Sequence, residues 1–270
     1  MSERRWVAVV GDNTVDRYVG EENVSFSGGN AFNVAVQLSR AGVAVRYFGA
    51  VGDDADADII RAGLHANGVR ATDLVALPGV TAVTDIRVTP DGDRVFERED
   101  FGVTADYFPS GADLDAIANA DWVHIGMLPR ADGLRSALGG VEHGVISQDC
   151  AVADGFDGLD VAFLSAGENA DAEAIAIEVR EAGVPLVVVT RGADGALARD
   201  DSHTFVQQAL PAKVVDTTGA GDSFIAGFIA ARLDGATLQE ALESGARLAS
   251  ATCGHRAGWP HTTTHEQDPR

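Results

Sequence analysis

The residues that could do chemistry gather in one short stretch, 214–224, which reads Val-Val-Asp-Thr-Thr-Gly-Ala-Gly-Asp-Ser-Phe. Three small residues, Gly219, Ala220 and Gly221, precede an acid, Asp222, where an apolar helical pattern begins. Glycine tolerates the dihedrals that turn successive N–H groups toward one point, and a helix start leaves its first four N–H groups without intrahelical partners. The stretch therefore predicts a cup for an anion, with phosphate as its natural ligand.

A carboxylate at the rim of a phosphate site needs its own explanation, because it repels a phosphate at rest. The arrangement makes better sense if Asp222 removes a proton from a nucleophile that attacks the phosphate. Asp222 is therefore predicted to be the general base of a phosphoryl transfer. An ordinary helix start stays open as an alternative, since aspartate and serine are favoured there simply as caps.

Two other phosphate-binding loops fit less well. A dinucleotide loop also begins Gly-x-Gly, but Phe224 occupies its third small position and would block close helix packing. A Walker loop needs a lysine directly after its last glycine, and the only lysine of the chain, Lys213, lies upstream of the glycines. The sequence therefore disfavours a nicotinamide enzyme and a Walker-type NTPase.

The charge and hydropathy of the chain disfavour several classes of binding partner. The 270 residues, enough for one large domain, include 41 acidic residues against 20 lysines and arginines, for a formal net charge of −21. Such a surface is a poor match for nucleic acid or anionic membrane, and no stretch approaches the roughly 20 apolar residues of a membrane span. We therefore expect no nucleic-acid or membrane partner, a cytoplasmic location, and a halophile-like acidic surface suited to high salt, which screens self-repulsion.

Earlier stretches of the chain must bring other ligand-binding groups to the anion cup. Residues 6–10 form a short apolar run typical of a strand buried on both faces of a parallel sheet. Ligands in such sheets bind beyond the carboxyl ends of the strands, where Asp12 and Asp16 would fall. Asn30 and Asn33 carry donors and acceptors suited to sugar hydroxyls, although Asn30 also suits a simple helix cap.

Apolar periodicity and turn residues divide the chain into alternating strands and helices. Helices are predicted near 30–38, 55–67, 114–118, 134, 169–181, 222–233 and 238–252, and strands at 6–10, 43–51, 122–125, 144–147, 161–164 and 185–190. This alternation predicts a mostly parallel sheet with helices on both faces. Hairpins at 14–26 and 81–98 do not fit the alternation and could pair into a small sheet covering a site. The polar tail from Pro260 is expected to be unpaired.

Two motifs, in this order and at this separation, carry a family resemblance. Ser-Gly-Gly-Asn-Ala-Phe-Asn-Val-Ala at 27–35 and Asp-Thr-Thr-Gly-Ala-Gly-Asp-Ser-Phe at 216–224 resemble the signatures of the ribokinase/PfkB family of carbohydrate kinases. Within that family, three further segments look most like the fructoselysine 6-kinases. They are Gly-Asp-Asn-Thr-Val-Asp at 11–16, Asp-Arg-Val-Phe at 93–96 and Gly-Val-Thr-Ala-Asp at 102–106.

The resemblance implies a ribokinase-like three-layer α/β/α fold. A single kinase domain would span 1–270, with a mostly parallel sheet and a small β-hairpin lid formed by segments about 12–27 and 80–98. Sugar would lie between the sheet and the lid, and ATP along the carboxyl edge of the sheet. By motif, Asp222 would be the base, and the backbone of Gly219, Ala220 and Gly221 would be the anion hole.

The resemblance also assigns binding residues. Those expected to hold the sugar are Asp12, Asp16, Gly28, Gly29, Asn30 and Asn33. Those expected along the nucleotide are Thr190, Arg191, Gly192, Gly195 and Gly254. Glu168 matches the family acid that influences Mg²⁺, although Ser165 replaces the asparagine that often accompanies it. Asp216 would help to bind a monovalent cation such as K⁺.

These implications predict an ATP- and Mg²⁺-dependent kinase that phosphorylates a primary hydroxyl of a small sugar or a fructosamine, with a homodimer formed through the lid. Fructose, ribose and a nucleoside stay open as other acceptors. A sensor that binds sugar or nucleotide without turnover stays open as a different class. His124, at the end of a predicted strand, is either a substrate contact or an ordinary buried histidine.

Overall fold

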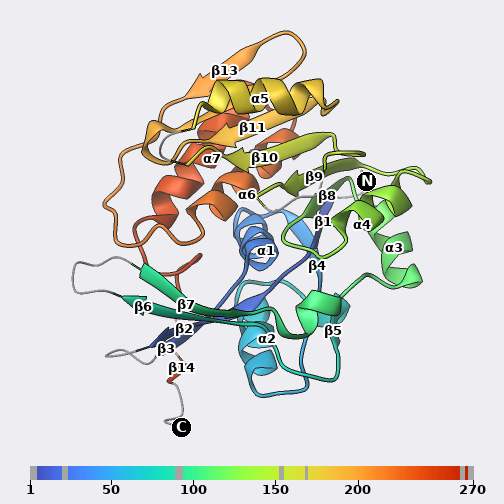
Figure 1. Cartoon of the computed structure of the whole chain (residues 1–270), viewed down its shortest axis with the longest axis vertical. Helices are drawn as coiled ribbons and strands as arrows, with labels where there is room; N and C mark the ends of the chain where they lie inside the picture. The colour runs from blue at the N-terminus through green and yellow to red at the C-terminus, as the bar shows by residue number, and fades with distance from the viewer. Residues whose placement is uncertain are drawn as a thin grey trace.

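A large sheet with helices on both faces dominates the molecule, and a second, smaller sheet lies beside it (Figure 1). Figure 1 shows a computed structural model, which describes residues 5–19, 24–88, 94–151, 155–167, 170–261 and 265–266. Over these ranges, none of the helices combines the length and the apolar character that crossing a bilayer requires.

The large sheet has the strand order β13-β12-β11-β10-β9-β8-β1-β4-β5 within the described residues. Its strands are β1 (Trp6–Val10), β4 (Ala44–Val51), β5 (Leu74–Ala76), β8 (Trp122–Ile125), β9 (Val145–Asp149), β10 (Val161–Ser165), β11 (Leu186–Thr190), β12 (Ala196–Arg199) and β13 (Thr204–Gln207). Strands from β11 to β5 are parallel, and β12 and β13 extend the sheet antiparallel. The predicted mostly parallel sheet is confirmed, while β5 is a strand that the sequence pattern missed.

Helices cover both faces of this sheet and complete three layers. They are α1 (Asn30–Arg40), α2 (Asp56–Ala66), α3 (Gly111–Ala118), α4 (Ala131–Leu138), α5 (Ala172–Glu181), α6 (Ala220–Leu233) and α7 (Leu238–Thr252). Side chains of α1, α6 and α7 share one hydrophobic cluster, and those of α3, α4 and α5 share another. The ribokinase-like layer order expected from the sequence motifs is therefore present.

The burial of strand β1 explains why residues 6–10 form a continuous apolar run. Val7 and Val9 pack into the cluster on one face of the sheet, while Ala8 and Val10 pack into the cluster on the other. All four are fully buried. Because side chains of a strand alternate between faces, a strand covered on both sides needs apolar residues at every position.

The smaller sheet joins segments that are far apart in the sequence. Its order is β14-β3-β2-β6-β7 within the described residues, with β2 (Thr14–Val19), β3 (Val24–Gly28), β6 (Val83–Val88), β7 (Arg94–Asp100) and β14 (His265–Glu266). The two predicted hairpins are β2/β3 and β6/β7, and parallel pairing of β2 with β6 unites them. The expectation of an unpaired tail was wrong for β14, which pairs with β3.

Helix α2 supports the small sheet at Gly63, where no side chain fits. A Cβ there would overlap Ser27 Oγ and lie 2.9 Å from Cζ of Phe32. We therefore expect Gly63→Ala to lower the melting temperature by a few degrees, although alanine is the better helix former by about 1 kcal/mol. Gly133→Ala in α4 is the matched control, because its Cβ would meet the Phe108 ring at an ordinary 3.6 Å. Equal melting temperatures for both variants would contradict the packing argument.

Candidate active site

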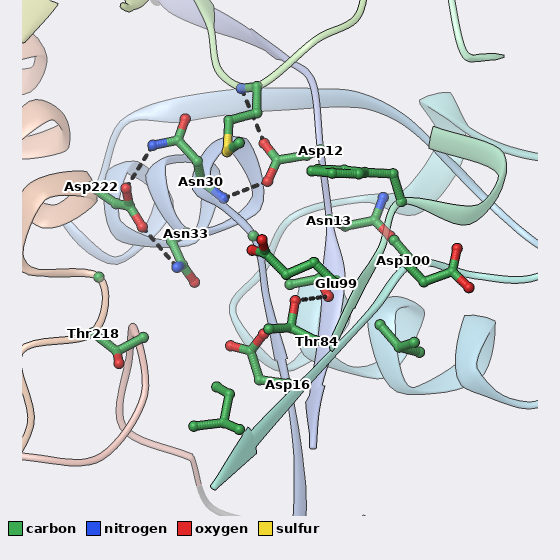
Figure 2. A pocket seen from close by; sticks show the side chains of 18 residues that line it. Asp12, Asn13, Asp16, Asn30, Asn33, Thr84, Glu99, Asp100, Thr218 and Asp222 are labelled. Atoms are coloured by element: carbon green, nitrogen blue, oxygen red, sulfur yellow. Dashed lines mark hydrogen bonds between the residues drawn. The ribbon is translucent and has the colours of Figure 1, made fainter. Parts of the chain in front are cut away.

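A cavity of about 190 Å³ lies between the two sheets, at the carboxyl end of β1 (Figure 2). Its walls come from the loop after β1, from the first turns of α1 and α6, and from strands β2, β6 and β7. The acidic side chains on its wall are Asp12, Asp16, Glu99, Asp100 and Asp222. Among the described residues, no lysine, arginine or histidine lines the cavity.

Asn30 connects three carboxylates at the deep end of this cavity. Its backbone N–H donates to Asp12 Oδ2 at 2.7 Å. Its side-chain Nδ2 donates to Asp222 Oδ1 at 2.7 Å and to Asp149 Oδ2 at 2.8 Å. Because the first residue of α1 makes all three bonds, the ends of β1 and β9 and the start of α6 are held at one point.

Asp12 caps helix α1 from outside the helix. The helix has Gly29 at its N-cap, with no side-chain capping bond of its own. Instead, Asp12 Oδ1 accepts the N–H of Ala31 at 2.9 Å, besides the bond from Asn30 to its other oxygen. A carboxylate at a helix start is stabilised by the free N–H groups and by the helix dipole. The interpretation of Asn30 as a simple cap was therefore wrong, because Asp12 has that role.

Asp222 lies in the first turn of α6, but it does not cap that helix. Gly219 is the N-cap, with φ of +72°, and no side-chain capping bond is present. A Cβ on Gly219 would overlap Gly258 Cα, so only glycine fits this turn. The Asp222 carboxylate turns instead toward α1, where Asn33 Nδ2 donates to its Oδ2 at 2.8 Å (Figure 2). The capping alternative for Asp222 is therefore excluded.

Removal from water raises the pKa of the carboxylates around Asn30. Burial raises the pKa of Asp222 to about 8, opposed by the amide donors and reinforced by the charges of Asp149 and Asp12. Burial likewise raises the pKa of Asp12 to about 6, against the pull of the backbone N–H groups. The pKa of Asp149 is also raised by burial. Such shifts are typical of groups that exchange protons in catalysis.

The structure brings together most of the residues predicted to bind sugar or to do chemistry. The predicted residues on the cavity wall are Asp12, Asp16, Gly29, Asn30, Asn33, Gly219 and Asp222. Ala220 and Gly221 lie in the first turn of α6, beside Asp222. Gly28 lies behind the wall, where a Cβ would overlap the Asp16 carboxylate, so its role is to leave room for that acid.

The residues predicted to bind nucleotide lie apart from this cavity. Thr190 ends β11, and Arg191 leads into a tight turn containing Gly192 and Gly195, both with positive φ. Gly254 follows α7. None of these residues lines the cavity. Thr190 lies at the carboxyl end of a parallel strand, the edge at which ligands of such sheets bind, so the nucleotide assignment stays a prediction.

Of the two residues predicted to bind a metal ion, the structure describes only Asp216. Glu168 lies outside the described residues. Asp216 lies before α6, where its carboxylate accepts the N–H of Thr218 at 2.6 Å and that of Ala257 at 3.0 Å. Asp216 therefore ties the loop before α6 to the loop after α7. Within the described ranges, no group of three or more potential metal ligands is found.

Sequence reasoning missed Asp149 and Glu99 for the same reason. The predicted strands ended at 147 and 98, whereas β9 runs to Asp149 and β7 runs past Glu99 to Asp100. Side chains at the carboxyl ends of parallel strands are the expected ligand contacts. Extending β9 by two residues would therefore have brought Asp149 into the predicted site.

His124 belongs to the core and not to the site. Its side chain is fully buried, and Nδ1 lies 3.0 Å from Ser147 Oγ. Burial lowers the pKa of His124 to about 3, which keeps the ring neutral. Of the two interpretations of this residue, the structure supports the ordinary buried histidine.

The fold and the site define a class of protein: a three-layer α/β enzyme whose acidic cavity meets a glycine-rich helix start. Residues 6–137 and 158–260 match the model of the pfkB family carbohydrate kinases. The chain therefore belongs to the pfkB family. It is a sugar kinase, a phosphotransferase for which family membership implies the use of ATP.

Named relatives agree with this membership, and a solved structure agrees with the fold. The chain is 36% identical over 265 residues to a fructoselysine 6-kinase of Shigella flexneri, covering 94% of this chain and 99% of that protein. It is 30% identical over 255 residues to a fructosamine kinase of Bacillus subtilis, covering 91% and 89%. The structure of Arabidopsis thaliana ribokinase complexed with ribose and ATP has a TM-score of 0.82 at 21% identity, covering 94% of each chain.

The raised pKa of Asp222 predicts the pH dependence of the enzyme. A carboxylate accepts a proton only when it is ionised, and the pKa of Asp222 is about 8 in the free enzyme. We expect kcat/KM to fall about tenfold per pH unit as the pH decreases below that value. The measurement is ADP release between pH 5.5 and 9.5. A flat profile from pH 6 to 8 would contradict proton acceptance by Asp222.

Replacing Asp149 should shift the pH profile of kcat/KM. Asp149→Asn removes a charge that helps to raise the pKa of Asp222, while the asparagine oxygen still accepts the Ala151 N–H. We expect the acid limb to move to lower pH and kcat to fall about tenfold, as for one lost hydrogen bond to a charged group. Asp132→Asn, on the exposed side of α4, removes the same charge and should do neither. A wild-type acid limb in Asp149→Asn would refute the coupling.

Proposed function

We propose that the protein is an ATP-dependent kinase that transfers the γ-phosphoryl group to a primary hydroxyl of a fructosamine, a ketose joined to an amine. The observation that carries the proposal is a cavity rich in hydrogen-bond acceptors, without a basic side chain among its described residues, beside Asp222 at a glycine-rich helix start. The names of the two relatives reported above support the same substrate class.

The proposed chemistry places the hydroxyl between Asp222 and the terminal phosphate of ATP. Asp222 accepts the hydroxyl proton, and Asn30 and Asn33 hold its carboxylate in place with bonds of 2.7 and 2.8 Å. The backbone N–H groups of the predicted anion hole, Gly219, Ala220 and Gly221, stabilise the negative charge that develops on the phosphoryl oxygens, and that of Ala220 must first leave the Thr217 carbonyl, to which it donates at 3.2 Å. Proximity and preorganised N–H donors then supply most of the rate enhancement.

Acceptor atoms without partners support a polyhydroxy substrate. The Oδ1 atoms of Asn13, Asn30 and Asn33 are buried without a hydrogen-bond partner, and all three residues line the cavity. Polar groups in a buried wall are normally satisfied, and this wall also carries five acidic side chains, so a ligand that brings several donors suits the cavity. A phosphorylated sugar is disfavoured, because the surrounding carboxylates repel it and no described lining residue carries a positive charge.

The proposed reaction also involves Mg²⁺ and a monovalent cation. Mg²⁺ would neutralise the charge of the transferring phosphoryl group, since the only lysine of the chain is Lys213, upstream of the glycines. Glu168 is the residue proposed to influence it. Asp216, whose oxygens already accept two backbone N–H groups, is proposed to share a monovalent cation such as K⁺ with nearby carbonyl oxygens.

We also propose that the small sheet acts as a lid and that two copies of the chain pair through it. Val80, Val95 and Phe101, in or beside β6 and β7, expose 54%, 38% and 47% of their surface. Val95 lies on the sheet, Val80 and Phe101 lie beside it, and exposed apolar side chains on or near an open sheet favour pairing with a second copy. The surplus of acidic residues fits an enzyme of a salt-rich cytoplasm.

The test is coupled ADP release over a panel of fructosamines, fructose, ribose and nucleosides, at several salt concentrations. We expect a fructosamine to give the highest kcat/KM. Asp222→Asn should lower turnover on it at least ~10²-fold, because the general base is lost, with ATP affinity nearly unchanged.

Asp132→Asn, on the exposed side of α4, is the control for loss of one charge. Near-normal turnover in Asp222→Asn would end the assignment of the base. Ligand binding without ADP release from any compound would instead identify a sensor.

A further inference from the structure

Glu99 differs from the other acids of strand β7. Glu97 forms an ion pair with Arg87. Asp100 forms one with Arg98 at 2.6 Å, and it also accepts the N–H of Gly102 at 3.0 Å. The carboxylate of Glu99 has no hydrogen-bond or ion-pair partner among the described residues. Arginines pair with Glu97 and Asp100, whereas no arginine, lysine or histidine among the described residues pairs with Glu99.

The free carboxylate points into the cavity. Figure 2 shows Glu99 turned toward the space in front of Asn33, whereas the side chain of Asp100 points away from that space. In the sheet, Glu99 lies opposite Thr84 of β6, and both residues line the cavity. Glu99 therefore faces the ligand from the small sheet, while Asp222 faces it from the large domain.

The rest of the wall offers this carboxylate no compensation. Asn13 and Asn33 are 1% and 3% exposed, and each has an Oδ1 without a partner. Both residues line the cavity together with Asp16, and no described residue of the wall is basic. A ligand that satisfies such a wall must bring hydrogen-bond donors, and a positively charged N–H group satisfies the carboxylate best, since hydrogen bonds between charged groups are the strong ones.

We propose that Glu99 is a specificity-determining residue that binds the ammonium group of the substrate amine. The proposal rests on the proposed fructosamine kinase function. The sugar end of the ligand carries its primary hydroxyl to Asp222, and the amine end pairs with Glu99 on β7. The same pairing excludes sugars that carry a phosphate in place of the amine, because the carboxylate repels an anion.

The experiment compares two acceptors that differ only in the group that joins a propyl chain to the sugar, an amine in one and an ether oxygen in the other. One is 1-deoxy-1-propylamino-fructose, whose amine is protonated at neutral pH, and the other is the neutral 1-O-propyl ether of fructose. The wild-type enzyme should prefer the amine. Glu99→Gln, which keeps the shape and removes the charge, should lower kcat/KM for the amine about tenfold or more, chiefly through KM, and leave the ether within about twofold.

Glu97→Gln is the matched control, because it removes the same charge two residues away on the same strand. It should preserve the preference for the amine. Equal losses on both acceptors in Glu99→Gln, or no loss on either, would overturn the role of Glu99 while leaving the kinase function intact. If the wild-type enzyme phosphorylates the ether as well as the amine, charge recognition is overturned. If it phosphorylates neither, the proposed function itself fails.

Discussion

One residue holds the site together, through its backbone N–H and its side-chain amide. Asn30 donates to Asp12, Asp149 and Asp222, which come from the loop after β1, the end of β9 and the start of α6. Carboxylates this close repel one another, so they remain together only where donors stand between them. If any one of these elements moved, a buried carboxylate would lose its hydrogen-bond donor. The position of Asp222 therefore depends on the positions of β1, β9 and α1.

This arrangement has a cost in stability that depends on pH. The pKa values of Asp12, Asp149 and Asp222 are all raised in the folded chain, to about 6 for Asp12 and about 8 for Asp222. A raised folded-state pKa contributes stability that is complete below the unfolded-state pKa, near 4, and is lost as the pH rises through the folded-state value. The folded chain is thus less stable at the pH at which Asp222 is ionised, and such a cost in stability is common at active sites.

The two sheets divide the work of recognition. The large sheet is covered by helices on both faces, and its loops hold the carboxylates in fixed positions. The small sheet, with fewer buried contacts, adds Asp16 and Glu99 to the cavity from strands β2 and β7. Under the proposed function, the large sheet would position the proton acceptor, and the small sheet would carry the groups that select the substrate.

The sequence by itself determined the fold class and pointed to the start of α6 as the candidate site. Strands buried on both faces require continuous apolar runs, and two glycine-containing motifs marked Asn30, Asn33, Gly219 and Asp222 as candidates, although a simple helix cap stayed open for Asn30 and Asp222. The tertiary structure alone decided what these residues contact. Asp149 and Glu99 are separated from Asp222 by many residues and lie just past the predicted strand ends, because strand boundaries depend on pairing with neighbours that sequence patterns do not contain. Likewise, only the folded chain shows that Asp12 caps α1 and that arginines neutralise the acids beside Glu99, since both depend on contacts between distant segments.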